Sequence, residues 1–113
     1  MSKEAFVVTL ENNGGYQPIL NGEPKTCGMR LGKVYLESSQ TYNQHSTNAH
    51  EEILVFLSGQ GQALIGEENS LCQVGKGKVL YIPPHTPHDI KNSCNESLVY
   101  IYYSFPLFPS YLN

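Results

Sequence analysis

The sequence predicts an all-β domain built from antiparallel strands. Short runs rich in Val, Ile, Leu, Tyr and Phe recur along the chain, and clusters of Gly, Asn, Ser and Glu separate them. No apolar pattern with a helical period persists for three turns. Strands at such short spacing are typical of an antiparallel sandwich or barrel.

The individual strands follow from these runs. The first is expected at Ala5–Leu10, and a short one near Pro18–Leu20 lies in an otherwise irregular stretch that ends at Gly32. Further strands are predicted at Lys33–Glu37, Ile53–Leu57, Gln62–Ile65, Leu71–Val74, Val79–Ile82 and Ser97–Ser104. The run Ile53–Leu57 is continuous and β-favouring, which indicates a buried strand and not a helix.

The C-terminal segment 105–113 is apolar but is interrupted by Pro106 and Pro109. Proline donates no ladder hydrogen bond, so an inner strand is not expected there. We expect this tail to pack across a sheet face or onto a second copy of the chain, and we therefore expect a homodimer.

Length and composition limit the function. A chain of 113 residues with 40% hydrophobic residues is typical of one globular domain, here residues 1–113. The net charge is −3 and no basic stripe is present, which argues against nucleic acid as a partner. No apolar run approaches the length of a membrane span, and no signal peptide is evident. Three cysteines without CxxC spacing favour a cytoplasmic protein.

All four histidines fall in two short segments, 45–59 and 77–92. Side chains at i and i+2 share one face of a strand, so His50 and Glu52 are expected to point the same way. The strand that follows them is apolar on both faces, where an imidazole or a carboxylate is costly unless it is paired or bound to a metal. These residue types suit a divalent transition metal.

The second segment resembles the motif G-x5-P-x-G-x2-H-x3-N of the cupin superfamily. Gly77, Pro83, His88 and Asn92 occupy the motif positions, and His85 stands where the family often has glycine. Asn92 is expected to close a turn.

The first segment resembles the other cupin motif, G-x5-H-x-H-x3,4-E-x6-G. His45, Glu52 and Gly59 match it, whereas Ser39 stands at its opening glycine and Thr47 at its second histidine. Together the two motifs span residues 39–92.

The resemblance implies an antiparallel double-sheet jelly-roll barrel that encloses a ligand cavity. It also implies metal ligation by His45, Glu52 and His88. We add His50 as a fourth ligand from strand geometry, and Thr47 is then expected beside the metal or bridged to it by water. The metal would be Zn, Fe, Ni or Mn, because the ligand types do not choose among them.

The expected function is that of a metal-binding cupin that acts on or binds a small polar molecule, as a dioxygenase, an isomerase or a lyase. The alternative is a non-catalytic binding or sensor module without an obligatory metal. The candidate catalytic residues are His85, in a proline-rich turn, and Tyr102, which is expected to share a strand face with Tyr100.

Overall fold

The computed structural model describes residues 3–11 and 14–107, and within these ranges the chain forms nine strands and no helix. The strands are β1 (Gln17–Asn21), β2 (Arg30–Leu36), β3 (His45–Ser46), β4 (His50–Ser58), β5 (Gln60–Ile65), β6 (Ser70–Gly75), β7 (Val79–Ile82), β8 (Pro87–Lys91) and β9 (Leu98–Pro106). The described residues contain no helix that is long and apolar enough to cross a membrane.

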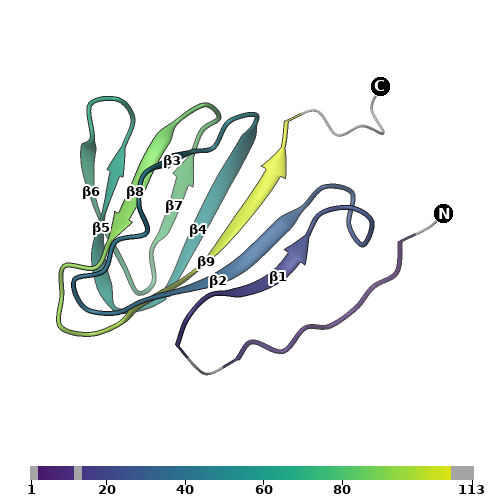
Figure 1. Ribbon diagram of the computed structural model, residues 1–113, viewed down its shortest axis with the longest axis horizontal. Helices are drawn as coiled ribbons and strands as arrows, with labels where there is room; N and C mark the ends of the chain where they lie inside the picture. The colour runs from purple at the N-terminus through teal and green to yellow at the C-terminus, as the bar shows by residue number, and fades with distance from the viewer. Residues whose placement is uncertain (1–2, 12–13, 108–113) are drawn as a thin grey trace.

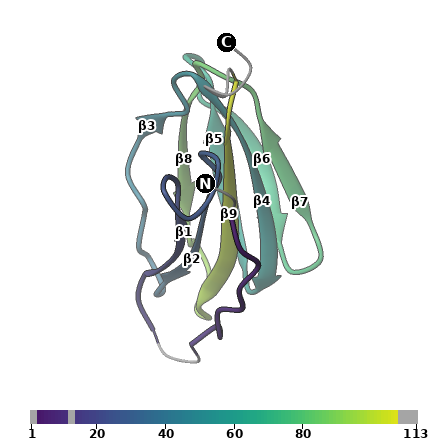
Figure 2. The same cartoon turned by 90° about the vertical axis from the view of Figure 1, so that its right-hand side faces the viewer.

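The strands form two antiparallel sheets that face each other, as Figures 1 and 2 show. One sheet has the strand order β1-β2-β9-β4-β7, and the other has the order β3-β8-β5-β6. The all-β double-sheet fold predicted from the sequence is confirmed, and the arrangement is consistent with a jelly roll.

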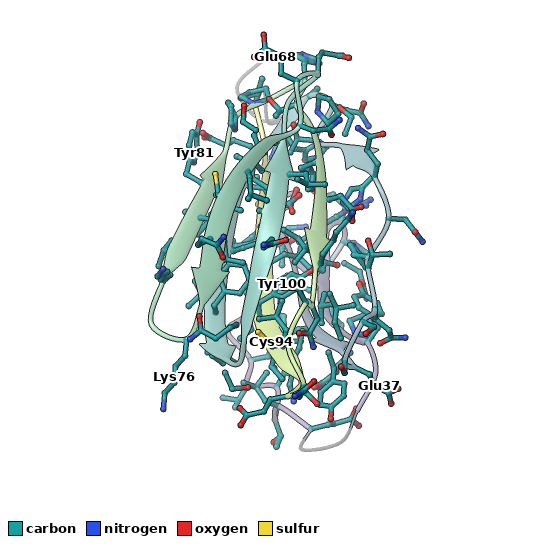
Figure 3. All side chains as sticks on the ribbon, turned by 90° about the vertical axis from the view of Figure 1, so that its left-hand side faces the viewer. Glu37, Glu68, Lys76, Tyr81, Cys94 and Tyr100 are labelled. Atoms are coloured by element: carbon teal, nitrogen blue, oxygen red, sulfur yellow. The ribbon has the colours of Figure 1, made fainter. Side chains whose placement is uncertain are left out.

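The core lies between the two sheets because the side chains of each strand alternate. Leu54 and Phe56 of β4 are buried, whereas the intervening Val55 and the following Leu57 are 37% and 40% exposed. Tyr100 and Leu98 of β9 are buried in the same layer, which Figure 3 shows with Tyr100 labelled. Even-numbered positions of β4 and β9 therefore face the interior.

The register of β2, β9 and β4 arranges the interior face of the five-stranded sheet in rows of three residues. These rows are Arg30–Ser104–Glu52, Gly32–Tyr102–Leu54 and Val34–Tyr100–Phe56. The first row is polar and the third is largely apolar. The interior is thus polar at the end where β4 begins and apolar toward the middle of the sheet.

The strand predicted at Ala5–Leu10 is wrong, because this segment carries no strand pairing. The side chain of Gln17 meets the polar backbone groups of the segment instead. Its Nε2 donates to Thr9 O (2.9 Å), and Glu11 N donates to its Oε1 (2.8 Å). Side-chain hydrogen bonds replace the ladder that the apolar pattern indicated.

Two strands were not predicted from the sequence. β3 has only two residues, and β8 begins with Pro87 and contains three charged or titratable side chains. Proline is accepted at the first residue of a strand, where it removes no interior hydrogen bond. These two strands carry His45 and His88 into the fold.

The expectation for the C-terminal tail needs correction at its start. Phe105 and Pro106 belong to β9, an inner strand, and Pro106 pairs with His50 of β4. The ladder between β9 and β2 ends at Ser104, so the missing N–H of Pro106 interrupts no pairing on that side. Residues 108–113 lie outside the described residues, and the homodimer stays a prediction.

Candidate metal and ligand site

Three titratable side chains from three strands meet between the two sheets. His45 on β3 and His88 on β8 are direct cross-strand partners, and their ring centroids are 4.2 Å apart. Glu52 reaches them from β4 in the opposite sheet, with its Oε1 3.9 Å from His88 Nε2. The two cupin-like segments of the sequence therefore converge at one place.

Each imidazole ring is oriented by a contact with the backbone carbonyl two residues before it. Nδ1 of His45 lies 3.1 Å from Asn43 O, and Nδ1 of His88 lies 3.1 Å from Thr86 O. A carbonyl oxygen only accepts hydrogen bonds, so each Nδ1 carries the proton and donates it. In the neutral ring the Nε2 lone pair is then free, which is the state in which histidine binds a metal.

Burial acts on the two inner members in opposite directions. It raises the pKa of Glu52, and the nearby His45 opposes that rise. It lowers the pKa of His88, whose exposed fraction is 2%, although the bond to the Thr86 carbonyl partly offsets this effect. Both shifts favour the neutral forms, so Glu52 and His88 by themselves do not form a strong ion pair.

Two spaces that share part of their lining adjoin this cluster. The outer cavity, of about 200 Å³, is lined by Arg30, Tyr42, His45, Glu52, Tyr102 and Ser104. The inner cavity, of about 10 Å³, is lined by Tyr42, His45, Glu52, Leu54, His88, Ile90, Tyr100 and Tyr102. Of the buried side-chain polar atoms in the described part of the chain, the Tyr100 hydroxyl is the one without a hydrogen-bond partner. It lies at a space about the size of one water molecule.

The donor set fits a divalent transition metal in kind: two imidazole nitrogens and one carboxylate. Two ligand atoms on one ion are about 3 to 3.4 Å apart, which is closer than the 3.9 Å between His88 Nε2 and Glu52 Oε1. Accordingly, no group of three or more His, Cys, Asp or Glu side chains within residues 3–11 and 14–107 has the arrangement to hold a metal ion. Ligation would require this distance to shorten.

The fourth ligand predicted from strand geometry is not brought to this cluster. His50 shares the inward face of β4 with Glu52, as expected, but it pairs with Pro106 at the first position of the strand. It lines neither the outer nor the inner cavity.

Thr47 has a structural contact in place of the expected contact with a metal. Its hydroxyl donates to Pro83 O (2.7 Å) and accepts from Thr86 N (3.0 Å), and the residue is 5% exposed. The proton of the Thr47 hydroxyl is thus used in a hydrogen bond that holds the turn leading to His88.

The comparison with protein families agrees with this geometry. A family model for the cupin domain matches residues 32–103, which is more than half of the chain. The chain belongs to the cupin family.

Known relatives of this cupin extend the comparison. An uncharacterized protein of Methanocaldococcus jannaschii is 40% identical over 73 residues, which are 65% of this chain and 55% of the relative. The chain thus spans about half the length of that relative. Several solved structures have a similar fold at low sequence identity.

The structure of a cupin protein from Bacteroides fragilis has a TM-score of 0.74 at 18% sequence identity, and the match covers 93% of this chain and 86% of that protein's chain. The Cnp3 cupin domain of Schizosaccharomyces pombe has a TM-score of 0.72 at 15% identity, covering 80% of this chain and 63% of the other.

The departures of this cupin from the family motifs have a backbone explanation. Ser39 and His85 stand at motif glycine positions, and both adopt the left-handed conformation, with φ of 69° and 52°. Gly59, which closes the first motif, also has a positive φ of 85°. The motif glycines therefore mark positions where the chain needs this conformation, and His85 is an exposed turn residue that lines neither cavity.

The other candidate catalytic residue, Tyr102, does line both cavities of this cupin. Its hydroxyl lies 2.5 Å from the hydroxyl of Tyr16, and burial together with this hydrogen bond raises its pKa. A Cβ at Gly32 would lie 2.7 Å from the Tyr102 ring, so the glycine makes room for that ring. As predicted, Tyr100 and Tyr102 share the inward face of β9.

Sequence reasoning missed Arg30 and Tyr42, which line the outer cavity. Arg30 lies before both motifs, and Tyr42 occupies an unspecified position of the first motif, between Ser39 and His45. The one available signal was the alternation in Arg30–Leu36, which places Arg30 on the same face as Val34.

Proposed function

We propose that this cupin binds one divalent transition metal through His45, Glu52 and His88, and binds a small polar molecule in the outer cavity. The observation that supports the metal is the convergence of these three side chains from β3, β4 and β8. The carbonyls of Asn43 and Thr86 leave the Nε2 atom of each histidine free in the required tautomer. Three protein ligands leave further coordination positions open, as a site that takes up substrate requires.

The residues around the cluster have separate tasks in this proposal. A metal of this class supplies a Lewis acid or, as iron, a redox centre, which corresponds to isomerase or lyase chemistry on the one hand and dioxygenase chemistry on the other. Tyr42 and Tyr102 form aromatic walls that orient the small molecule. The buried Tyr100 hydroxyl can donate a hydrogen bond into the inner cavity, because nothing else in the described structure accepts its proton.

Metal uptake tests the proposal. Protein stripped with a chelator is titrated separately with Zn²⁺, Fe²⁺, Ni²⁺ and Mn²⁺, and bound metal is measured by elemental analysis after desalting. We expect about one equivalent for at least one metal, and at least a tenfold weaker uptake for the His45→Ala and Glu52→Gln variants. His85→Ala is the matched control, because it removes an exposed histidine that lines neither cavity.

The same titration decides the role of His50. If three ligands hold the metal, His50→Ala takes up metal as the unaltered protein does. A loss of uptake in this variant would restore the fourth ligand expected from strand geometry. Less than about a tenth of an equivalent in the unaltered protein, for all four metals, contradicts the metal proposal.

A second candidate function is a metal-free binding module. It is favoured by the 3.9 Å gap between His88 Nε2 and Glu52 Oε1, and by the threonine at the place of the second motif histidine. In that case the same cavity binds its small molecule directly, through the Glu52 carboxyl and the free Nε2 atoms. Ligand binding that is unchanged by complete removal of metal supports this candidate.

A further inference from the structure

Arg30 is the single arginine of the chain, and it lies at the wall of the outer cavity. It is the first residue of β2 and belongs to the polar row of the interior face, opposite Ser104 of β9. Its guanidinium is therefore the one permanent positive charge among the residues that line this space.

No carboxylate in the described structure neutralises this charge. The ion pairs found there are Lys3–Glu23 and His88–Glu52. Glu52 lies in the same row as Arg30, but Ser104 stands between them in the register. Adjacent strands are about 4.8 Å apart, so the backbones of Arg30 and Glu52 are separated by about 10 Å.

The arginine side chain passes close to the loop between β1 and β2. Gly22 is buried with a φ of 83°, and Gly22 N donates to Met29 O (3.1 Å), which closes this loop. A Cβ at Gly22 would lie 3.7 Å from Arg30 Nε, so the side chain runs directly past the glycine. The loop therefore lies beside the Arg30 side chain, which lines the cavity.

The chemistry of the wall selects the kind of ligand. A guanidinium presents parallel N–H donors that match the two oxygens of a carboxylate. The hydroxyl of Ser104 is a further donor at the same place, and Tyr42 and Tyr102 add aromatic surface for a short carbon chain. A volume of about 200 Å³ lies below the roughly 300–1,000 Å³ of pockets that hold drug-sized ligands, so the cavity suits a small organic acid.

We propose that Arg30 makes the outer cavity selective for a small molecule that carries a carboxylate group, which pairs with the guanidinium while the remainder of the molecule extends toward Glu52 and His45. This inference rests on the proposed binding of a small molecule in this cavity. It adds the chemical class of that molecule and the residue that recognises it.

The test compares two probes of the same shape. Metal-free protein is titrated with butyrate and with butyramide, its neutral analogue, and binding is followed by NMR. We expect butyrate to bind at least tenfold more tightly than butyramide, and Arg30→Gln to remove this preference because the charge-assisted bonds are lost. Arg30→Lys is expected to keep part of the preference, since it retains the charge without the paired donors.

Lys76→Gln is the matched control. It also removes one positive charge, but Lys76 projects from the turn between β6 and β7, at the opposite end of β4 from Glu52 (Figure 3). We expect it to bind butyrate as the unaltered protein does. Equal binding of the two probes, no binding of butyrate, or an Arg30→Gln variant that still prefers butyrate overturns the inference.

Metal uptake by the unaltered protein separates this inference from the metal proposal. If the unaltered protein takes up metal but binds butyrate no more tightly than butyramide, the inference alone is wrong. A carboxylate preference that depends on Arg30, in a protein that takes up no metal, means that the inference stands and the metal proposal is wrong.

Discussion

His45 and His88 are cross-strand partners with ring centroids 4.2 Å apart, yet His88 is buried and His45 is exposed. β3 is the edge strand of its sheet, whereas β8 lies between β3 and β5. The edge position of β3 therefore leaves one of two chemically equal side chains exposed, while the other is buried.

We expect His88→Ala to lower the free energy of unfolding by about 2–4 kcal/mol, because it leaves a cavity and an unpaired Thr86 carbonyl in the interior. His45→Ala is expected to cost less than about 1 kcal/mol. Urea denaturation of the two metal-free variants measures the difference. Equal losses would mean that the histidine pair, and not burial, determines the stability.

Thr47 should affect stability and leave metal uptake unchanged. Thr47→Val keeps the shape but removes both the donor to Pro83 O and the acceptor for Thr86 N. We expect a loss of about 1–3 kcal/mol in the free energy of unfolding, because two backbone groups lose their partner. Thr47→Ser keeps the hydroxyl and is the control, with a loss of less than about 1 kcal/mol. Reduced metal uptake in a stable Thr47→Val variant would instead assign Thr47 to the metal site.

The left-handed residues at motif glycine positions offer a gain in stability. In Ser39→Gly and His85→Gly the Cβ that conflicts with a φ of 69° or 52° is removed. We expect each variant to be more stable by up to about 1 kcal/mol, measured as a rise in the thermal midpoint. Gln44→Gly, at an exposed position that is not among the residues with positive φ, is expected to lose stability. A loss at Ser39 and His85 as well would show that their side chains contribute more than the backbone conformation costs.

The local pattern of apolar runs and turn residues was sufficient to predict many of the strands. β7 was predicted at its observed bounds, Val79–Ile82, because its apolar run is flanked by strong turn residues. The run Ile53–Leu57 marked the centre of β4 for the same reason. Ala5–Leu10 failed because its apolar pattern has no strand to pair with, and pairing is not a local property.

The candidate site was predictable only as far as the family motifs reach. They identified His45, Glu52 and His88, which the structure brings together. Arg30 enters the outer cavity through the register of β2 with β9, and Thr47 bonds a turn 36 to 39 residues away. Such relationships depend on long-range pairing, where a shift of one residue would turn the opposite face inward.

Glu52 should make the metal-free protein less stable at neutral pH than a variant with a neutral side chain. Burial raises the pKa of Glu52 above its ordinary value of 4.5. Below pH 4.5 the carboxyl is protonated in both the folded and the unfolded chain, so it contributes no pH dependence. Above pH 4.5 the unfolded chain releases its proton more readily than the folded protein does, so the stability of the unaltered protein falls relative to Glu52→Gln.

We therefore expect metal-free Glu52→Gln to have the higher thermal midpoint at pH 7, and the difference to shrink as the pH falls toward 4. Glu51→Gln is the control, because Glu51 lies on the opposite face of β4, where its Oε1 accepts a hydrogen bond from the Tyr81 hydroxyl (2.8 Å). Addition of metal should reverse the order at pH 7, since the ion stabilises the Glu52 carboxylate and binds only the unaltered protein strongly. If Glu52→Gln is the less stable protein at pH 7 without metal, the Glu52 carboxylate is stabilised by His45 and His88 more than it is destabilised by burial.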